Sequence, residues 1–238
     1  MSLIPFVVHE SKTWCLVHKP HKMPTAPLHE NEENTLVSWF LSQYPEGFNV
    51  KGRKSIEKGL IHRLDTDTSG LVLFALNQNT FDIFLEAQKK GEIIKNYHAF
   101  CSIDSLFDQS ILSKTPFLVT GRFKAWGPGR KKVRTVQIGM KGYEKAGEEY
   151  NTRIISITHN ANCYSVSCEL SKGFRHQVRV HLSDLGLPIM GDILYNTNVS
   201  LSTNCIPLQL HAIGISFFDP DSLTKVSFSL PPPDKMTQ

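Results

Sequence analysis

The sequence predicts an α+β protein built on a mixed, largely antiparallel sheet. The segments RIISIT and CYSVSCEL alternate apolar and polar residues and predict a hairpin over Arg153–Leu170. Strand-like and helical runs follow one another without the regular strand–helix–strand rhythm of a doubly wound fold. With 238 residues, of which 40% are hydrophobic, the chain can bury a substantial core. No repeat or low-complexity linker divides it, so we expect residues 1–238 to form a single domain.

The N-terminal part of the chain is expected to begin with a strand at Thr13–His18. The segment Lys19–Asn34 is rich in Pro, His and Glu and predicts a loop. Thr35–Tyr44 carries apolar residues at helical spacing and predicts a short helix. Leu71–Leu76 is continuously apolar and follows Gly70, which is typical of a buried strand.

The middle of the chain predicts a second helix at Thr80–Lys90, followed by a strand at Ile93–Ile103. Asn79 or Thr80 is suited to cap the start of this helix, and Gly91 is suited to end it. The basic residues in its last turn complement the helix dipole.

The C-terminal part of the chain begins with the hairpin, whose turn we expect at Asn160–Asn162. A helix is expected at His176–Leu185 and ends before Gly186. Strands return at His211–Phe218 and Lys225–Leu230, and the Pro-rich tail is expected to be irregular.

Positive charge is clustered, although the formal net charge is only +4. One cluster, within 121–134, contains no acid and consists of Arg122, Lys124, Arg130, Lys131, Lys132 and Arg134. The other, within 50–58, holds Lys51, Arg53, Lys54 and Lys58 against the single acid Glu57. Such clusters supply phosphate contacts in nucleic-acid binders, but solvated surface loops have the same composition.

Five cysteines, an odd number, occur without any CxxC spacing, so we expect reduced thiols rather than disulfides or a zinc site. The first residues lack the basic segment of a signal peptide, and no apolar stretch is long enough for a membrane span. These observations indicate a cytoplasmic protein.

The run GLIHRLDTDTSGLVLFAL, Gly59–Leu76, places Asp65 between Arg63 and a Thr-Ser-Gly turn, directly before the apolar strand. Two interpretations are open. Asp, Thr, Ser and Gly all favour turns and bonds to the local backbone. Alternatively, the loop holds a carboxylate at the mouth of a sheet, beside a cation and ready to act on a substrate.

A metal site is not expected around His176 and His181. Their spacing of five places them apart around a helix, and the chain has no HExxH motif or third-ligand pattern.

Several motifs occur in the order found in one known family. HRLD followed by TSGL resembles the signature of the RluA-like family of RNA pseudouridine synthases. The segments similar to the family's other motifs are WCLVHKP at 14–20, KNYHA at 95–99, KGFRHQVRVHLSDLGLPIMGDILY at 172–195 and LQLHAIGISFFDP at 208–220. The resemblance covers nearly the whole chain.

The resemblance implies an enzyme that isomerises a specific uridine to pseudouridine in ribosomal or transfer RNA. It implies a sheet split by a central catalytic cleft and a reaction that needs neither metal nor cofactor. Asp65 matches the essential carboxylate, and whether it acts as nucleophile or as base stays open. Tyr97 matches the active-site aromatic residue. Arg179 matches the cation that keeps the carboxylate ionised, a role suited to a forked guanidinium.

Further residues are candidates for binding the substrate. These are His62, Arg63, Lys19, His176 and Gln177, with the basic residues of 121–134 as candidates for contacts to the RNA backbone. Arg63 is suited to fill the stack left by a flipped uridine. For Arg63 and His62, a bond to the motif's own backbone is the alternative.

The chain departs from the family where KPHKMPT replaces K-P-x-G and where Phe174-Arg175 replaces Arg-Thr. The second change is expected to affect the geometry of the cleft or the choice of substrate. The Gly-Pro-Gly at 127–129 predicts a mobile loop that closes over RNA.

Because the motifs begin within the first twenty residues, we expect no separate N-terminal RNA-binding module. We also expect the protein to be a monomer. Two other functions stay open. A non-catalytic RNA-binding protein would keep the fold without the reaction. A hydrolase using Asp65 and a histidine would release free uracil.

Overall fold

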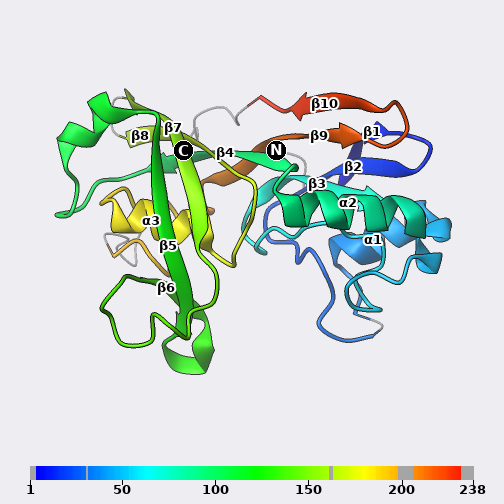
Figure 1. Ribbon diagram of the computed structural model, residues 1–238, viewed down its shortest axis with the longest axis horizontal. Coiled ribbons are helices and arrows are strands. Elements are labelled where there is room, and N and C mark those ends of the chain that lie inside the picture. Colours follow the sequence, from blue (N-terminus) through cyan, green and yellow to red (C-terminus); the bar gives the residue numbers. More distant parts are fainter. Residues whose placement is uncertain (1–3, 31, 161–162, 198–205, 232–238) are drawn as a thin grey trace. The chain divides into compact units, whose positions relative to one another are not determined.

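The computed structural model describes residues 4–30, 32–160, 163–197 and 206–231, and it divides into two units (Figure 1). The first unit comprises residues 1–95 and 211–238, and the second comprises residues 96–210. Ala161 and Asn162 of the predicted turn, Cys205, and the tail beyond Pro231 lie outside the described residues.

The first unit contains a sheet whose neighbouring strands come from both ends of its sequence. In spatial order they are β1 (Phe6–Glu10), β2 (Trp14–Lys19), β3 (Ser69–Ala75), β9 (Leu210–Asp219) and β10 (Thr224–Ser229). The pairs β1–β2, β2–β3 and β9–β10 are antiparallel, and β3–β9 is parallel. The predicted strands of this unit are therefore present. β1 was not expected from its sequence.

The described part of the first unit contains the α-helices α1 (Leu36–Gln43) and α2 (Gln78–Lys90). Thr35 caps α1 by accepting a hydrogen bond from the N–H of Ser38. The predicted cap of α2 is wrong by two residues or more, because Asn77 accepts the Thr80 N–H at 2.9 Å. Gly91 ends α2 in the left-handed conformation, as expected.

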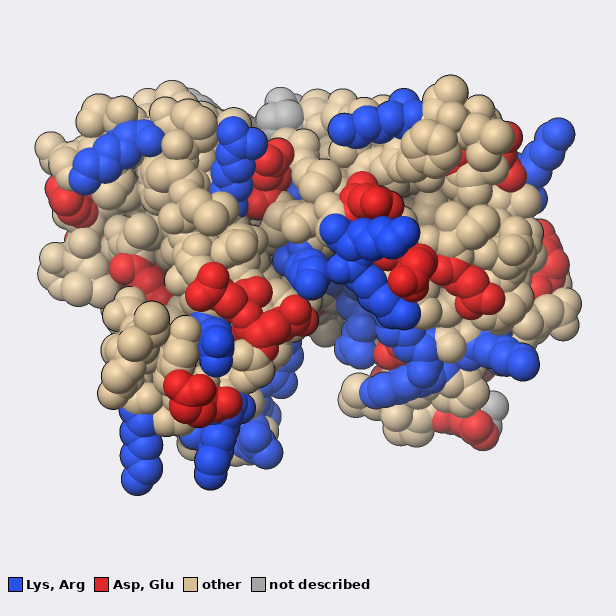
Figure 2. All heavy atoms as spheres, in the orientation of Figure 1, with Lys and Arg blue, Asp and Glu red and all other residues tan. Residues whose placement is uncertain are grey.

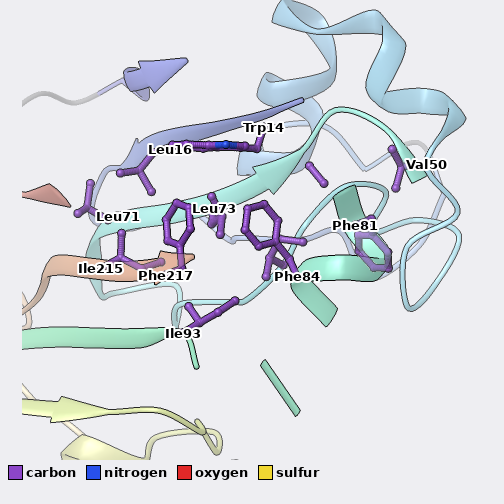
Figure 3. Packing of buried hydrophobic residues seen from close by; sticks show 12 residues of the cluster. Trp14, Leu16, Val50, Leu71, Leu73, Phe81, Phe84, Ile93, Ile215 and Phe217 are labelled. Carbon is purple, nitrogen blue, oxygen red and sulfur yellow. The ribbon is translucent and has the colours of Figure 1, made fainter. Parts of the chain in front are cut away.

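The core of the first unit lies between the sheet and α2. Figure 3 shows Trp14, Leu73, Phe84 and Phe217 pointing toward one another from β2, β3, α2 and β9. The Trp14 ring meets Phe217 edge-on at 5.0 Å, and its Nε1 donates to Asp219 at 2.6 Å. Every residue of β3 is buried, which explains its continuous apolar sequence.

The second unit carries strands in the order β4 (Ile94–Cys101), β8 (Cys163–Leu170), β7 (Tyr150–Asn160), β5 (Phe117–Trp126) and β6 (Lys132–Val136). The predicted hairpin is confirmed as the antiparallel pair β7–β8. Helix α3 (Gln177–Asp184) packs Val180 against Phe123 and Val133. The α+β class with a largely antiparallel sheet is confirmed.

The Gly-Pro-Gly at 127–129 lies in a connection, as expected, but the two strands that it joins were not predicted. Residues 117–136 form the antiparallel hairpin β5–β6, and Gly-Pro-Gly lies at its tip with the short 3₁₀ helix η3 (Pro128–Arg130). Apolar residues alternate with cations over 122–125 and 132–134, which is the period of a sheet. Two further 3₁₀ helices, η1 (Pro45–Asn49) and η2 (Gln109–Lys114), connect longer elements.

Four cysteines carry free thiols in the described part of the chain: Cys15, Cys101, Cys163 and Cys168. No helix within the described ranges is both long and apolar enough to cross a bilayer.

Candidate active site

Asp65 lies in the loop that leads into β3, in the first unit. Its carbonyl oxygen accepts the N–H of Thr68 at 3.0 Å, which closes a turn, and the residue is half-buried. The Asp-Thr-Asp-Thr segment therefore does form the turn that its composition indicates. The neighbouring contacts explain how this turn is held.

Lys19, at the end of β2, is fully buried. Its side chain connects the Asp65 turn to the loop at 19–34. Its Nζ donates to the carbonyls of Met23 at 2.7 Å, Thr66 at 3.0 Å and Pro20 at 3.0 Å. Burial lowers the pKa of Lys19 to about 7, and the nearby carboxylates oppose that effect. Only the protonated amine offers three donors to these three acceptors.

Thr25 and His21 add contacts between the same two segments. Thr25 Oγ1 donates to the Leu64 carbonyl at 2.7 Å and accepts the Leu64 N–H at 3.2 Å. His21 Nδ1 lies 2.6 Å from the carbonyl oxygen of Asp67. The loop at 19–34 therefore fixes the backbone on both sides of Asp65.

The end of the Asp65 loop is held against β9. Ser69 Oγ lies 2.7 Å from His211 Nδ1. Gly70 has a φ of +124°, and a Cβ there would lie 2.2 Å from the backbone oxygen of Ala212. Only glycine permits this approach of β3 to β9.

A Lys19→Met variant is expected to lower the free energy of unfolding by about 3 kcal/mol, because buried carbonyls lose their donor. Urea denaturation monitored by circular dichroism measures the change. The control is Lys22→Met, an exposed lysine of the same loop, with an expected change below about 0.5 kcal/mol. Equal stabilities for the two variants would contradict the structural role of Lys19.

His62 and Arg63 differ in accessibility. His62 is 5% exposed, and its Nε2 accepts the N–H of Leu73 at 3.3 Å. Burial holds the pKa of His62 well below its ordinary value, so the ring is neutral. The Arg63 side chain is 52% exposed and pairs with the buried Glu57 at 3.3 Å. Arg63 is therefore accessible to solvent, whereas the contact of His62 is with the motif's own backbone.

Lys95 was not a candidate on its own, although it belongs to the motif around Tyr97. It is 4% exposed on β4, and burial lowers its pKa to about 8, an effect that Arg53 increases. Lys95 and Tyr97 occupy alternate positions of β4, so their side chains lie on the same face of the strand. The charge of Lys95 also contributes to the low pKa of His62.

Tyr97 and Arg179 lie in the second unit and are both buried. Tyr97 belongs to β4, and Arg179 lies on the first turns of α3. Arg179 forms a bidentate ion pair with Asp192, in which Nε donates to Oδ2 at 2.7 Å and Nη2 donates to Oδ1 at 2.8 Å. The ring of Tyr195 lies 5.2 Å from the guanidinium carbon. Arg179 is thus oriented by groups of its own unit.

Asp192 was not among the candidate site residues. Its Oδ1 accepts the N–H groups of Leu194 at 2.9 Å and Tyr195 at 3.2 Å. Its ion pair with Arg179 was missed. The available signal was an arginine between two valines, Val178 and Val180, because a buried guanidinium requires a carboxylate.

His176 and Gln177 form bonds within the second unit at the start of α3. Gln177 is 2% exposed and donates to the Asn151 carbonyl and to Thr152 Oγ1, both at 3.0 Å. His176 Nδ1 lies 2.8 Å from the Tyr195 hydroxyl. The contacts of Gln177 fix α3 against β7, and a substrate role for Gln177 or His176 stays a prediction.

His181 on α3 is fully buried, and burial lowers its pKa to about 4. Below pH 6.5 the unfolded chain binds a proton that the folded chain excludes, so stability falls as the pH drops toward 4. We expect His181 to account for about 3 kcal/mol of this loss. Urea unfolding between pH 7 and pH 4 should therefore show a flatter profile for His181→Asn than for the unchanged chain. Identical profiles would contradict this assignment.

The candidate residues thus form two groups. Lys19, His62, Arg63 and Asp65 are brought together in the first unit, while His176, Gln177 and Arg179 lie together in the second. The basic residues of 121–134 are on the β5–β6 hairpin. In the described ranges, no three His, Cys, Asp or Glu side chains are placed to hold a metal ion.

Comparison with known proteins shows that the chain is similar to RNA pseudouridine synthases. A family model described as "RNA pseudouridylate synthase" matches residues 13–184. The chain is 31% identical over 232 residues to a Helicobacter pylori J99 protein named "Uncharacterized RNA pseudouridine synthase", with 94% of this chain and 65% of the relative covered. It is 27% identical over 240 residues to "Ribosomal large subunit pseudouridine synthase D" of Neisseria meningitidis Z2491, with 96% of this chain and 58% of that protein covered.

The fold is also similar to a solved structure, "Human RNA Pseudouridylate Synthase Domain Containing 1". The TM-score is 0.71 at 21% identity, with 97% of this chain and 84% of that chain covered. The chain spans about two thirds or less of the length of the curated relatives named above.

Proposed function

Because this chain belongs to the RNA pseudouridylate synthase family, we propose that it converts a specific uridine of an RNA into pseudouridine. The observation that carries the proposal is the Asp65 loop. Its sequence matches the family signature, and buried contacts from Lys19 and Thr25 hold its backbone in place. A chain that needed only a turn would not need these contacts on both sides of one half-buried carboxylate.

The reaction breaks the bond between N1 of uracil and the ribose, and forms a bond from C5 of uracil to the same ribose carbon. The proton of C5 is lost, and N1 gains one, so the RNA keeps its mass and no co-reactant is consumed. We assign Asp65 to the ribose, as nucleophile at the anomeric carbon or as base at its neighbour. Either role requires the ionised carboxylate.

Tyr97 and Arg179 are proposed to serve the same reaction. The Tyr97 ring is suited to stacking on uracil, and its hydroxyl is suited to moving the C5 proton. Arg179 is proposed to keep Asp65 ionised, and the bidentate contact from Asp192 fixes the direction of its guanidinium. Arg63, exposed in the Asp65 loop, is proposed to fill the stack vacated by the uridine.

Ribosomal RNA is the proposed substrate, with transfer RNA as the alternative. The name of the Neisseria meningitidis relative supports ribosomal RNA. We further propose that the protein acts in the cytoplasm, which agrees with the free thiols of its described cysteines, and that it is a monomer.

The test distinguishes isomerisation from the two other functions. Unmodified ribosomal and transfer RNA transcripts are incubated with the pure protein and digested to nucleosides, and pseudouridine and free uracil are quantified. Pseudouridine without free uracil is the expected result. Free uracil would favour a hydrolase, and RNA binding with neither product would favour a binding protein.

A further inference from the structure

The β5–β6 hairpin has two chemically different faces. Its register pairs Lys124 with Arg134 and Trp126 with Lys132. Because side chains alternate across a sheet, these four residues share one face, and the apolar residues between them share the other. We refer to the face formed by Lys124, Trp126, Lys132 and Arg134 as the Trp126 face.

The opposite face of the hairpin is anchored to α3 and its surroundings. Phe123 stacks on Phe174 with ring centroids 5.2 Å apart and an angle of 10°. The N–H of Val133 donates to the Tyr195 hydroxyl at 2.7 Å. Arg175 donates to two backbone carbonyls near the tip. These contacts fix the hairpin through Phe123 of its apolar face and through backbone atoms.

The Trp126 face carries charge that the local sequence does not balance. None of the residues 109–143 is acidic. Lys124 and Arg134 lie directly opposite each other, an arrangement that destabilises a hairpin. Within the described part of the chain, neither takes part in an ion pair with a carboxylate. A bound polyanion would offset this repulsion.

Trp126 is an exposed aromatic residue within this positive face. Its side chain is 47% exposed, and the Arg134 guanidinium lies 5.8 Å from the ring centroid. Arg122 stacks on the Tyr143 ring, with its guanidinium carbon 4.2 Å from the ring centroid, and therefore holds the following loop. Trp126 and Arg134, nearer the tip, are exposed, whereas Lys124 and Lys132 are half-buried.

We propose that the Trp126 face binds a single-stranded segment of RNA, with one base stacked on Trp126 and phosphates on Lys124, Lys132 and Arg134. Cations alternating with an exposed aromatic ring suit unpaired nucleotides, whose base faces are accessible. A duplex hides those faces within its stack. Figure 2 shows Lys and Arg side chains gathered toward the tip of this hairpin. The inference rests on the proposed function for the identity of the polyanion as RNA.

The test measures binding of the full chain to a ten-residue oligouridine and to an RNA duplex of equal length. Trp126→Leu is expected to weaken oligouridine binding by about 5- to 100-fold, the effect of one lost stacking contact. Duplex binding should change by less than about threefold. Trp126→Phe should keep most of the affinity. Phe218→Leu, at an aromatic residue that is 53% exposed on β9, is the control and should have no effect.

Salt dependence separates stacking from charge. Arg134→Gln is expected to reduce the slope of log affinity against log salt by about 0.7, the value for one phosphate of a single strand. Trp126→Leu should leave the slope unchanged. Poly-aspartate serves as an anion without bases, and Trp126→Leu should not affect its binding. If Trp126→Leu weakened poly-aspartate equally, the face would fit an acidic protein segment and the inference would be overturned.

Pseudouridine formation, measured on the same protein preparations, separates this inference from the proposed function. If the protein forms pseudouridine but Trp126→Leu does not change its affinity for oligouridine, the inference is overturned and the proposed function stands. Trp126-dependent binding of oligouridine with no isomerisation of any RNA would overturn the proposed function and support the inference.

Discussion

An Asp65→Asn variant is expected to lose pseudouridine formation by at least about 100-fold, the lower limit of what a positioned acid or base contributes. The amide matches the carboxylate in shape but is neither a base nor a nucleophile at the ribose. The loop should survive the change, because its contacts from Lys19, Thr25 and Thr68 are made with backbone atoms. RNA affinity should therefore change by less than about threefold.

The matched control is Asp67→Asn, two residues further along the same turn. Its backbone carbonyl is the group contacted by His21, so the turn also survives this change. We expect its activity to stay within about threefold of the unchanged chain. Single-turnover formation of pseudouridine measures both variants. Equal losses in both, or activity kept in Asp65→Asn, would contradict the role assigned to Asp65.

An Asp192→Ala variant is expected to have the largest effect on stability, lowering the free energy of unfolding by about 3–5 kcal/mol. The change leaves the buried Arg179 guanidinium without the bidentate carboxylate on its Nε and Nη2 atoms. It also removes the acceptor for two backbone N–H groups. Denaturant unfolding followed by circular dichroism measures the loss.

Glu169→Ala is the control for this prediction, because it removes the partly exposed ion pair with Arg153. Its expected effect is below about 1 kcal/mol. A double variant, Arg179→Met with Asp192→Leu, should recover stability without recovering pseudouridine formation. Equal free energies of unfolding for Asp192→Ala and Glu169→Ala would show that the ion pair with Asp192 does not stabilise the buried Arg179.

Local patterns were sufficient for most strands and helices of the fold. The continuous apolar run at Leu71–Leu76 predicted the strand β3, and the alternation over Arg153–Leu170 predicted the β7–β8 hairpin. The cap of α2 was misplaced because Asn77, Asn79 and Thr80 are all good capping residues. The β5–β6 hairpin was missed because glycine and lysine at its tip obscure its alternation.

The site required tertiary information. The motif around Asp65 was recognisable, and its turn chemistry was predicted. The bond from Lys19 to Thr66 joins residues 47 positions apart, so no local pattern contains it. Arg179 was predicted as a cation at the site, but the sequence did not show that Asp192, 13 positions later, orients it. For His62, the alternative of a bond to the motif's own backbone corresponds to the observed contact.

Pseudouridine mapping across unmodified ribosomal and transfer RNA transcripts tests the central claim most directly. The transcripts are incubated with the pure protein or with its Asp65→Asn variant, and every modified position is read out. We expect one new pseudouridine, at the same position in every preparation of the unchanged protein and absent with the variant. RNA that is bound but carries no pseudouridine at any position would contradict the account.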